Sequence, residues 1–144
     1  MKLAVITGGG RGIGAAISES LAADGYRILL TYNNDSQSAE SVITNLRQDS
    51  VDCVAVKVDC GRTDEVFILA DHPWMQDGVD ALILNHGMYR RSPAHELTMD
   101  DLQETMDVNF RGAVAVYSAL SKHLSPKASI VVIGSQLGIR GSPH

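Results

Sequence analysis

The chain has 144 residues and a net charge of −5 at pH 7, with 44% hydrophobic and 20% charged residues. This composition lies in the globular range, so we expect a single domain over residues 1–144 and not a disordered segment. Scattered Lys and Arg in an acidic chain exclude a nucleic-acid surface, which requires a clustered basic face. No apolar run approaches the roughly 20 residues of a bilayer span, and the chain opens on a strand-like run instead of a signal peptide. We therefore expect a cytoplasmic protein that does not bind membranes.

Cysteine and histidine spacing indicates no metal or redox centre. Cys53 and Cys60 lie seven residues apart, which fits neither a C-x-x-C pair nor a zinc ligand set. The histidines never occur at the spacing of H-E-x-x-H. We expect reduced structural thiols, no bound metal, and a solvated pair at His95-Glu96.

Strand-like apolar runs alternate with helical stretches along the chain. Runs rich in Val, Ile and Leu predict strands at residues 3–7, 27–32, 53–58, 81–85 and 130–133. Helical spacing, capping residues and prolines predict helices at residues 12–23, 35–48, 63–72 and 98–125. The strands are apolar throughout, which is typical of parallel strands covered by helices on both faces.

Successive β–α units of this kind predict an α/β fold with a doubly wound, Rossmann-like parallel sheet. We expect five strands in the order 3-2-1-4-5, with the chain returning to the middle of the sheet after the third strand. In such a sheet the ligand site lies at the carboxyl ends of the strands.

Apolar stripes at helical spacing predict which helix faces are buried. The first helix places Ile13, Ile17 and Leu21 on one face. The last helix carries a longer stripe, formed by Phe110, Val114, Tyr117, Leu120 and Leu124.

A glycine-rich turn, Thr7-Gly-Gly-Gly-Arg-Gly-Ile-Gly14, separates the first strand from the first helix. Glycines permit a tight turn and let backbone N–H groups approach a pyrophosphate at the positive end of the helix. The turn is not a P-loop, because Ala15-Ala16 stands where Lys-Ser or Lys-Thr would be required. The alternative is a loop that needs glycine for its geometry alone. The expected cofactor-binding residues of this turn are Gly8, Gly9, Gly10, Arg11, Gly12, Ile13 and Gly14.

Several motifs in chain order resemble the short-chain dehydrogenases/reductases, particularly members similar to 3-oxoacyl-carrier-protein reductases. The turn matches the T-G-x-x-x-G-x-G pattern of that family, and the resemblance continues over all 144 residues. Asp59-Cys60 stands where the family has an Asp that holds the adenine amino group and a neighbour that lines the ring. Asn85 and Gly87 match the N-N-A-G motif after the fourth strand, and His86 replaces its Ala.

The resemblance implies hydride transfer between a nicotinamide cofactor and a small carbonyl or alcohol substrate. Asn109 and Ser135 match the family's catalytic Asn, which anchors a relay water, and its catalytic Ser, which orients the carbonyl. The family's Tyr-x-x-x-Lys pair is absent from this sequence and would follow a few residues after His144. We expect the cofactor-binding portion of a longer oxidoreductase, with little activity alone, later strands and helices missing, and the fifth strand left at an edge.

Other functions are weaker alternatives. The chain could be a noncatalytic dinucleotide-binding module or a truncated, inactive product. A hydrolase is disfavoured, because residues 134–138 read G-S-x-x-G and lack the G-x-S-x-G order of a nucleophile elbow. A methyltransferase shares only the fold class, which does not determine function.

The end of the second strand favours NADP over NAD. An NAD site usually has a carboxylate here for the ribose 2′-OH, whereas this chain has Tyr32 and Asn33. A 2′-phosphate attracts a guanidinium, which Arg11 supplies from the glycine-rich turn. Asp35 is the contrary sign, and we expect it to cap the following helix instead.

The long stripe resembles the helix through which this family forms dimers and tetramers, so we expect a homo-oligomer of the complete protein. The alternative is that Phe110, Val114 and Tyr117 belong to the core of this chain. Residues 88–91 follow the fourth strand and border the expected site; the two arginines among them could attract an anionic substrate or could lie in a solvated loop.

Overall fold

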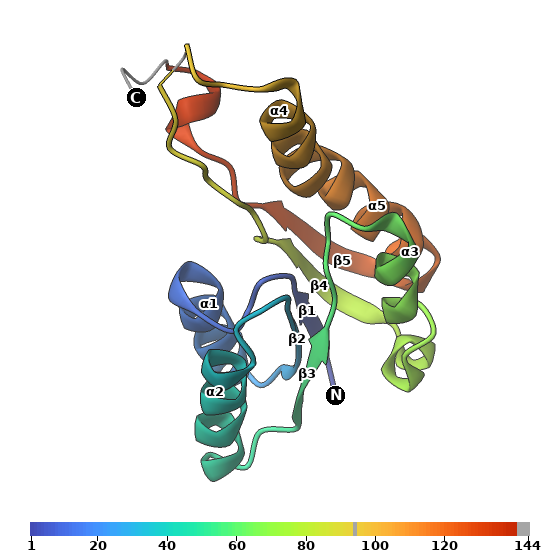
Figure 1. The fold of residues 1–144 in the computed structure, drawn as a ribbon. Helices are drawn as coiled ribbons and strands as arrows, with labels where there is room; N and C mark the ends of the chain where they lie inside the picture. Colours follow the sequence, from blue (N-terminus) through green and yellow to red (C-terminus); the bar gives the residue numbers. More distant parts are fainter. Residues whose placement is uncertain (94, 141–144) are drawn as a thin grey trace.

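A five-stranded parallel sheet forms the centre of the computed structural model, which describes residues 1–93 and 95–140 (Figure 1). Its strands lie in the order β3-β2-β1-β4-β5, as predicted. Their bounds are Leu3–Ile6 for β1, Arg27–Tyr32 for β2, Cys53–Lys57 for β3, Val79–Leu84 for β4 and Leu124–Val132 for β5. The predicted α/β class and doubly wound, Rossmann-like sheet are confirmed.

Helices cover both faces of the sheet (Figure 1). On one face lie α1 (Gly12–Ala23) and α2 (Ser36–Gln48). On the other lie α3 (Thr63–Val66), α4 (Met99–Met106) and α5 (Gly112–Leu120), with a π-helical turn, η3 (Asp107–Arg111), joining α4 to α5. Short 3₁₀ turns complete the chain at Phe67–Leu69, Pro73–Asp77, Ser121–His123 and Gln136–Gly138.

The core consists of two apolar layers that the sheet separates. Successive side chains of a strand point to opposite faces. Leu3 and Val5 of β1 therefore pack with residues of α5, whereas Ala4 and Ile6 pack with residues of α2. All four are fully buried, which explains why the strand is apolar at every position.

Helix α1 buries a stripe that lies one residue away from the predicted one. Its buried positions are Gly14, Ser18 and Ala22, and Ile13 is exposed. Ile17 and Leu21 are only partly buried. The small residues let the helix approach the sheet closely, and the Ser18 hydroxyl donates to the Gly14 carbonyl oxygen at 2.9 Å.

Two predicted N-caps are confirmed. The Asp35 carboxylate accepts a hydrogen bond from the Ser38 N–H at 3.0 Å, so Asp35 precedes α2 as its N-cap. Thr98 and Asp101 form a reciprocal capping box at the start of α4.

The last predicted helix is wrong at its carboxyl end. Helix α5 ends at Leu120, and Leu124 is the first residue of β5, where it pairs with Val79. The helical spacing of Leu124 was coincidental, because a 3₁₀ turn separates it from the helix. The third predicted helix is also shorter, since α3 ends at Val66 and a 3₁₀ turn follows.

Apolar side chains are exposed on the β5 side of the molecule. Phe110, Val114 and Tyr117 are 60%, 54% and 45% exposed, so the interpretation that they belong to the core of this chain is wrong. Strand β5 lies at the edge of the sheet, as expected, and Val132 is 64% exposed. The two-sided cover typical of the other strands does not extend to β5, which agrees with the expectation that the fifth strand is left at an edge.

Within residues 1–93 and 95–140, none of the helices is long and apolar enough to cross a bilayer. The same residues contain no group of three or more His, Cys, Asp and Glu side chains that could hold a metal ion. Cys53 and Cys60 are buried free thiols, and His95 lies 3.5 Å from Glu96 in an exposed pair.

Candidate functional site

A cleft of about 940 Å³ opens where β1, β2, β3 and β4 end. This is the edge of a doubly wound sheet at which ligands bind. Most predicted cofactor-binding residues line it, namely Gly8, Gly10, Arg11, Gly12, Ile13, Gly14, Tyr32, Asn33, Asp59, Cys60, Asn85 and Gly87. Gly9 does not line it, nor do Asn109 and Ser135.

Two glycines of the turn are required by close packing. A Cβ on Gly14 would lie 2.2 Å from the Gly8 carbonyl oxygen, so a larger residue would displace the backbone of the turn. A Cβ on Gly9 would lie 2.6 Å from the Cβ of Leu30. Gly9 therefore allows the turn to pack on β2, and its place is beneath the cleft.

The amino end of α1 presents unsatisfied donors at the cleft. Arg11 is the N-cap residue, and its side chain makes no capping hydrogen bond. The first N–H groups of a helix have no partner within it, and the helix dipole adds partial positive charge there. Because Gly12, Ile13 and Gly14 line the cleft, this end can hold an anion such as a phosphate.

Hydrogen bonds fix the turn to the neighbouring strands. The Asn85 side-chain amide, just after β4, donates to the carbonyl oxygens of Thr7 and Gly8 at 3.1 and 3.0 Å. On the other side, the Gly8 N–H donates to the Thr31 hydroxyl at 3.1 Å. The turn is thus held in place before any ligand arrives.

The carboxylate that follows β2, that of Asp35, is engaged by the first turn of α2. Asp35 lines the cleft, but its two oxygens accept from the Ser38 N–H at 3.0 Å and the Ser38 hydroxyl at 2.8 Å. These hydrogen bonds, with a smaller contribution from the charge of Arg11, hold the pKa of Asp35 below 3.8. Arg11, Asn33 and Asn34 are the other exposed polar groups at this end of the cleft.

Asp59 and Cys60 follow β3 and form another wall. The Asp59 carboxylate accepts from the Gly61 N–H at 2.9 Å, which shapes the turn after the strand. Burial raises the pKa of the Cys60 thiol to about 12. The thiol is therefore protonated at neutral pH and serves neither as a nucleophile nor as a metal ligand.

Asn109 lies in the π-helical turn and faces the segment after β4. Its Oδ1 accepts from the Met88 N–H at 2.7 Å, and its Nδ2 donates to the Met88 carbonyl oxygen at 2.9 Å. Ser135 follows β5, and its hydroxyl accepts a hydrogen bond from the Leu137 N–H at 3.1 Å. No hydrogen bond joins the side chains of Asn109 and Ser135.

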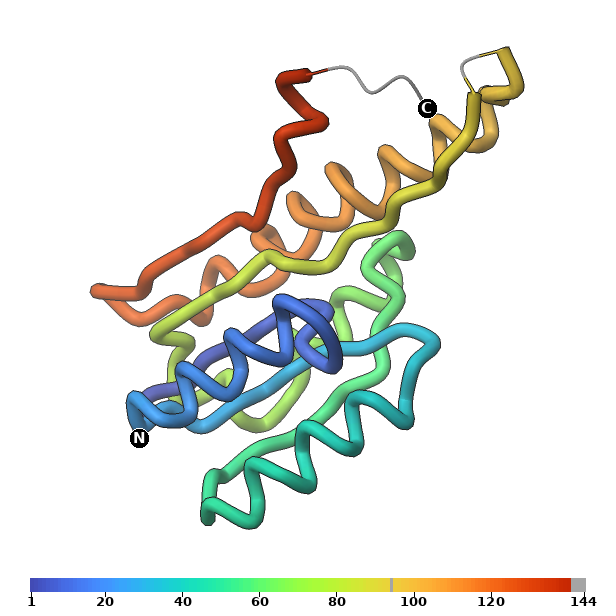
Figure 2. Tube along the Cα trace, turned by 90° about the vertical axis from the view of Figure 1, so that its left-hand side faces the viewer, coloured from blue at the N-terminus to red at the C-terminus, as the bar shows by residue number. Residues whose placement is uncertain are grey.

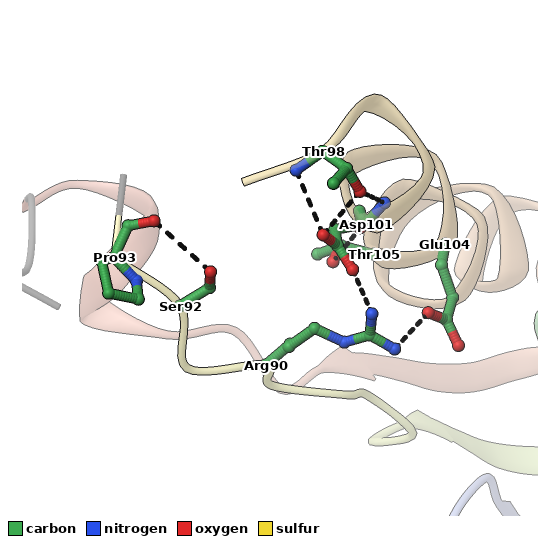
Figure 3. A network of polar contacts seen from close by, with 7 residues as sticks. All are labelled: Arg90, Ser92, Pro93, Thr98, Asp101, Glu104 and Thr105. Carbon is green, nitrogen blue, oxygen red and sulfur yellow. Dashed lines mark hydrogen bonds and ion pairs between the residues drawn. The ribbon is translucent and has the colours of Figure 1, made fainter. Parts of the chain in front are cut away.

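The segment after β4 runs beside α4, as Figure 2 shows. Arg90 holds it there, because its guanidinium contacts the carboxylates of Asp101 and Glu104 on α4 (Figure 3). The nitrogen–oxygen distance to Glu104 is 2.6 Å. With two carboxylate partners, Arg90 is less able to attract an anionic substrate than the sequence suggested.

The cleft also contains residues that sequence reasoning did not assign to it. Glu104 lies in α4 and Val108 in η3, and the sequence gives no sign that these residues line the same cleft as the glycine-rich turn. His86 was visible as a departure from the family motif, but its place in the cleft was not predicted. Thr31, Asn34, Asp35 and Val58 complete this set, whereas Met88, which was expected to border the site, lines the cleft as predicted.

Comparison with known protein families matches residues 2–144 to the family described as short chain dehydrogenase. The chain belongs to this family. The resemblance inferred from the sequence motifs is thereby confirmed. The match includes the glycine-rich turn and the segment that contains Ser135.

Relatives in this family are longer than the chain. A versicolorin reductase of Emericella nidulans is 30% identical over 145 residues, which cover 99% of this chain and 55% of the relative. A hydroxynaphthalene reductase of Aspergillus fumigatus is 29% identical over 143 residues, covering 99% and 52%. A short chain dehydrogenase from Burkholderia cenocepacia, solved in complex with NADP, is 34% identical with a TM-score of 0.92, over 98% of this chain and 58% of that one. The chain spans about half the length of these proteins.

Proposed function

We propose that the cleft binds NADP(H) and that the chain is the cofactor-binding portion of an oxidoreductase acting on a small carbonyl or alcohol. The amino end of α1 carries this proposal, because its first N–H groups lack partners within the helix and lie beside Arg11. The carboxylate that follows β2, that of Asp35, caps α2. The similar Burkholderia enzyme, solved with NADP, supports the choice of cofactor.

The residues present fit a dinucleotide. The N–H groups of Gly12 and Ile13 would hold the pyrophosphate, and Asp59 with the backbone of Cys60 would hold the adenine. Arg11 and Asn33 would bind the 2′-phosphate, since a guanidinium matches phosphate geometry. The remaining predicted residues would line the ribose and pyrophosphate, namely Gly8, Gly9, Gly10, Gly14, Tyr32, Asn85 and Gly87. Among these, Gly9 would act through packing, from beneath the cleft.

When bound, NADPH supplies a hydride to a carbonyl carbon, or NADP accepts one from an alcohol. The Ser135 hydroxyl would orient the substrate oxygen, and Asn109 would anchor a water that relays the proton. Asn109 holds the Met88 backbone in this structure, which keeps the segment after β4 against the helix. We propose no nucleic-acid or membrane partner.

Replacement of Arg11 tests the choice of cofactor. Arg11→Ala should weaken NADPH binding roughly 10- to 100-fold, the usual effect of losing a charge-assisted hydrogen bond, and leave NADH binding nearly unchanged. Fluorescence titration of both dinucleotides measures this difference. Lys122→Ala, which removes an exposed cation from the turn between α5 and β5, is the control and should change neither affinity. Equal losses for both dinucleotides would contradict the NADP assignment.

A noncatalytic dinucleotide-binding module is the second candidate. Oxidation of NADPH in the presence of a panel of small carbonyl compounds should be measured for this chain and for a version extended past His144. Activity of the extended version supports the oxidoreductase, and its inactivity together with tight binding supports the module.

We also propose that the exposed stripe on η3 and α5 mediates homo-oligomer formation. Phe110, Val114 and Tyr117 place exposed apolar surface on one stretch of helix, and such surface favours association. Sedimentation should show self-association that Val114→Glu abolishes. The control is Glu40→Gln on α2, at an exposed position on the opposite face of the sheet. A monomer at all concentrations would contradict this proposal.

A further inference from the structure

The imidazole ring of His86 lies between the glycine-rich turn and the helix that carries Asn109. Its Nδ1 is 2.7 Å from the Thr7 hydroxyl oxygen, at the end of β1. Its Nε2 faces the start of α5, where a Cβ on Gly112 would lie only 3.0 Å away. The ring therefore lies between the glycine-rich turn and the η3–α5 helix, which contribute Gly8 and Val108 to the cleft.

The hydrogen bonds of Thr7 determine which form of the ring fits. The Thr7 hydroxyl oxygen already accepts from the backbone N–H groups of Asn85 at 3.0 Å and His86 at 3.2 Å. A hydroxyl has two lone pairs and one proton, so this oxygen has no lone pair left for a third donor. The short contact is therefore a hydrogen bond that Thr7 donates to an unprotonated Nδ1. The carbonyl oxygen of Ile83, at 3.2 Å, is the more distant acceptor for the same proton.

The other ring nitrogen is buried and makes no hydrogen bond of good geometry within the described residues, and the backbone of Val108 is the polar group that acts on the ring from η3. Burial lowers the pKa of His86, while the Val108 backbone and the charge of Asp59 oppose that effect. Asp59 is the charged group that acts on the ring, and the neighbouring Cys60 thiol is neutral. A positive charge on the ring would therefore be poorly solvated in addition to being placed against Thr7.

We propose that His86 is a positioning residue that, in its neutral form, holds the glycine-rich turn and the η3–α5 helix at the separation that the dinucleotide requires. The inference rests on the proposed function, because the cleft is where the dinucleotide would bind. Protonation of Nδ1 would place a third donor on the Thr7 oxygen, so this contact would break. The turn would then lose a support, and dinucleotide affinity would fall as the ring becomes charged.

The test compares NADPH affinity from pH 8 down to about pH 4.5 in the unchanged chain, His86→Ala and His86→Asn, because burial lowers the pKa of the ring. An Asn side-chain amide can accept from Thr7 as Nδ1 does, and it does not titrate in this range. At pH 8 we expect His86→Asn to match the unchanged chain and His86→Ala to bind about fivefold more weakly, the usual effect of one lost hydrogen bond. The 2′-phosphate of the ligand titrates in the same range in all proteins, so the ratios of affinities isolate the ring.

As the pH falls through the pKa of His86, which burial lowers, the unchanged chain should progressively lose affinity relative to both variants. His95→Ala, which removes an exposed histidine, should retain the pH profile of the unchanged chain. NMR of the His86 ring shows the pH range in which it titrates, and identical affinity profiles for the unchanged chain and His86→Ala across that range would overturn the inference and leave the proposed function standing. Equal affinities of His86→Ala and His86→Asn at pH 8 would overturn it as well. A lack of NADPH binding by the unchanged chain at pH 8 would instead overturn the proposed function and the inference with it.

Discussion

The β1 side and the β5 side of the sheet differ in how completely the helices of this chain cover their strands. The residues of β1 are fully buried between helices on both faces, whereas three residues of β5, Ile130, Val131 and Val132, are 43–64% exposed. The glycine-rich turn and the end of β2, where the proposed cofactor contacts concentrate, lie on the covered side. A site held by a complete core needs little rearrangement to bind its ligand, and the exposed side is where further protein can attach. Substitutions should therefore be costly on one side and tolerated on the other.

The largest difference in stability and in NADPH affinity is expected between alanine substitutions at two glycines. Gly14→Ala would place a Cβ 2.2 Å from the Gly8 carbonyl oxygen, which must move. Such overpacking should lower the free energy of unfolding by about 3 kcal/mol and weaken NADPH binding more than tenfold. Gly134→Ala, after β5, is the matched control, because an added Cβ meets nothing within 4 Å. Urea denaturation and fluorescence titration measure both effects, and equal stabilities of the two variants would contradict the comparison.

A smaller difference is expected between two valines of the same sheet. Val5 in β1 is fully buried, and Val132 in β5 is 64% exposed. Val5→Ala should lower the free energy of unfolding by about 2 kcal/mol, through lost burial and a residual cavity. Val132→Ala should lower it by less than about 0.5 kcal/mol. Chemical denaturation of the two variants decides the point, and a loss at Val132 as large as at Val5 would show that β5 is covered in solution.

The smallest effect on stability is expected from the titration of Asp101, at the start of α4. Hydrogen bonds from the Thr98 hydroxyl and N–H, together with Arg90, hold the pKa of Asp101 below 3.8. The stabilisation from this group is therefore present above pH 3.8 and lost as the pH falls through the lower, folded value. Asp101→Asn should flatten this part of the stability profile, and Asp100→Asn, one residue earlier, should not. Carbon NMR of the Asp101 carboxylate gives its pKa directly, and a value at or above 3.8 would contradict this account.

Local chemistry explains which parts of the fold were predictable. Apolar runs locate the five strands, and the caps at Asp35 and Thr98 fix two helix starts, because each depends on neighbouring residues alone. The start of β5 was missed because Leu124 continues the apolar spacing of α5, and only pairing with Val79 identifies it as a strand residue. The buried stripe of α1 was misplaced by one residue, since small residues at Gly14 and Ser18 pack closest to the sheet.

The residues of the cleft also divide into those that the local sequence predicts and those that depend on packing between distant elements. The turn after β1 and the residues after β2, β3 and β4 follow from the rule that parallel strands end at one edge. Glu104 and Val108 were missed, because their place in the cleft depends on how α4 and η3 lie across that edge of the sheet. The contact between His86 and Thr7 joins residues 79 positions apart, and no pattern in the sequence predicts it.

The reactivity of the Cys60 thiol reports local unfolding around the cleft. Its thiol is buried in the wall of the cleft and protonated, and burial also raises the pKa of Cys53, under α2. Alkylating reagents attack thiolates, so neither residue should react while its surroundings stay closed. The rate at which each thiol is labelled therefore measures how often its part of the chain unfolds locally. Because the two thiols lie at opposite ends of β3, one labelling experiment would compare the opening of the cleft with that of the distant end of the same strand.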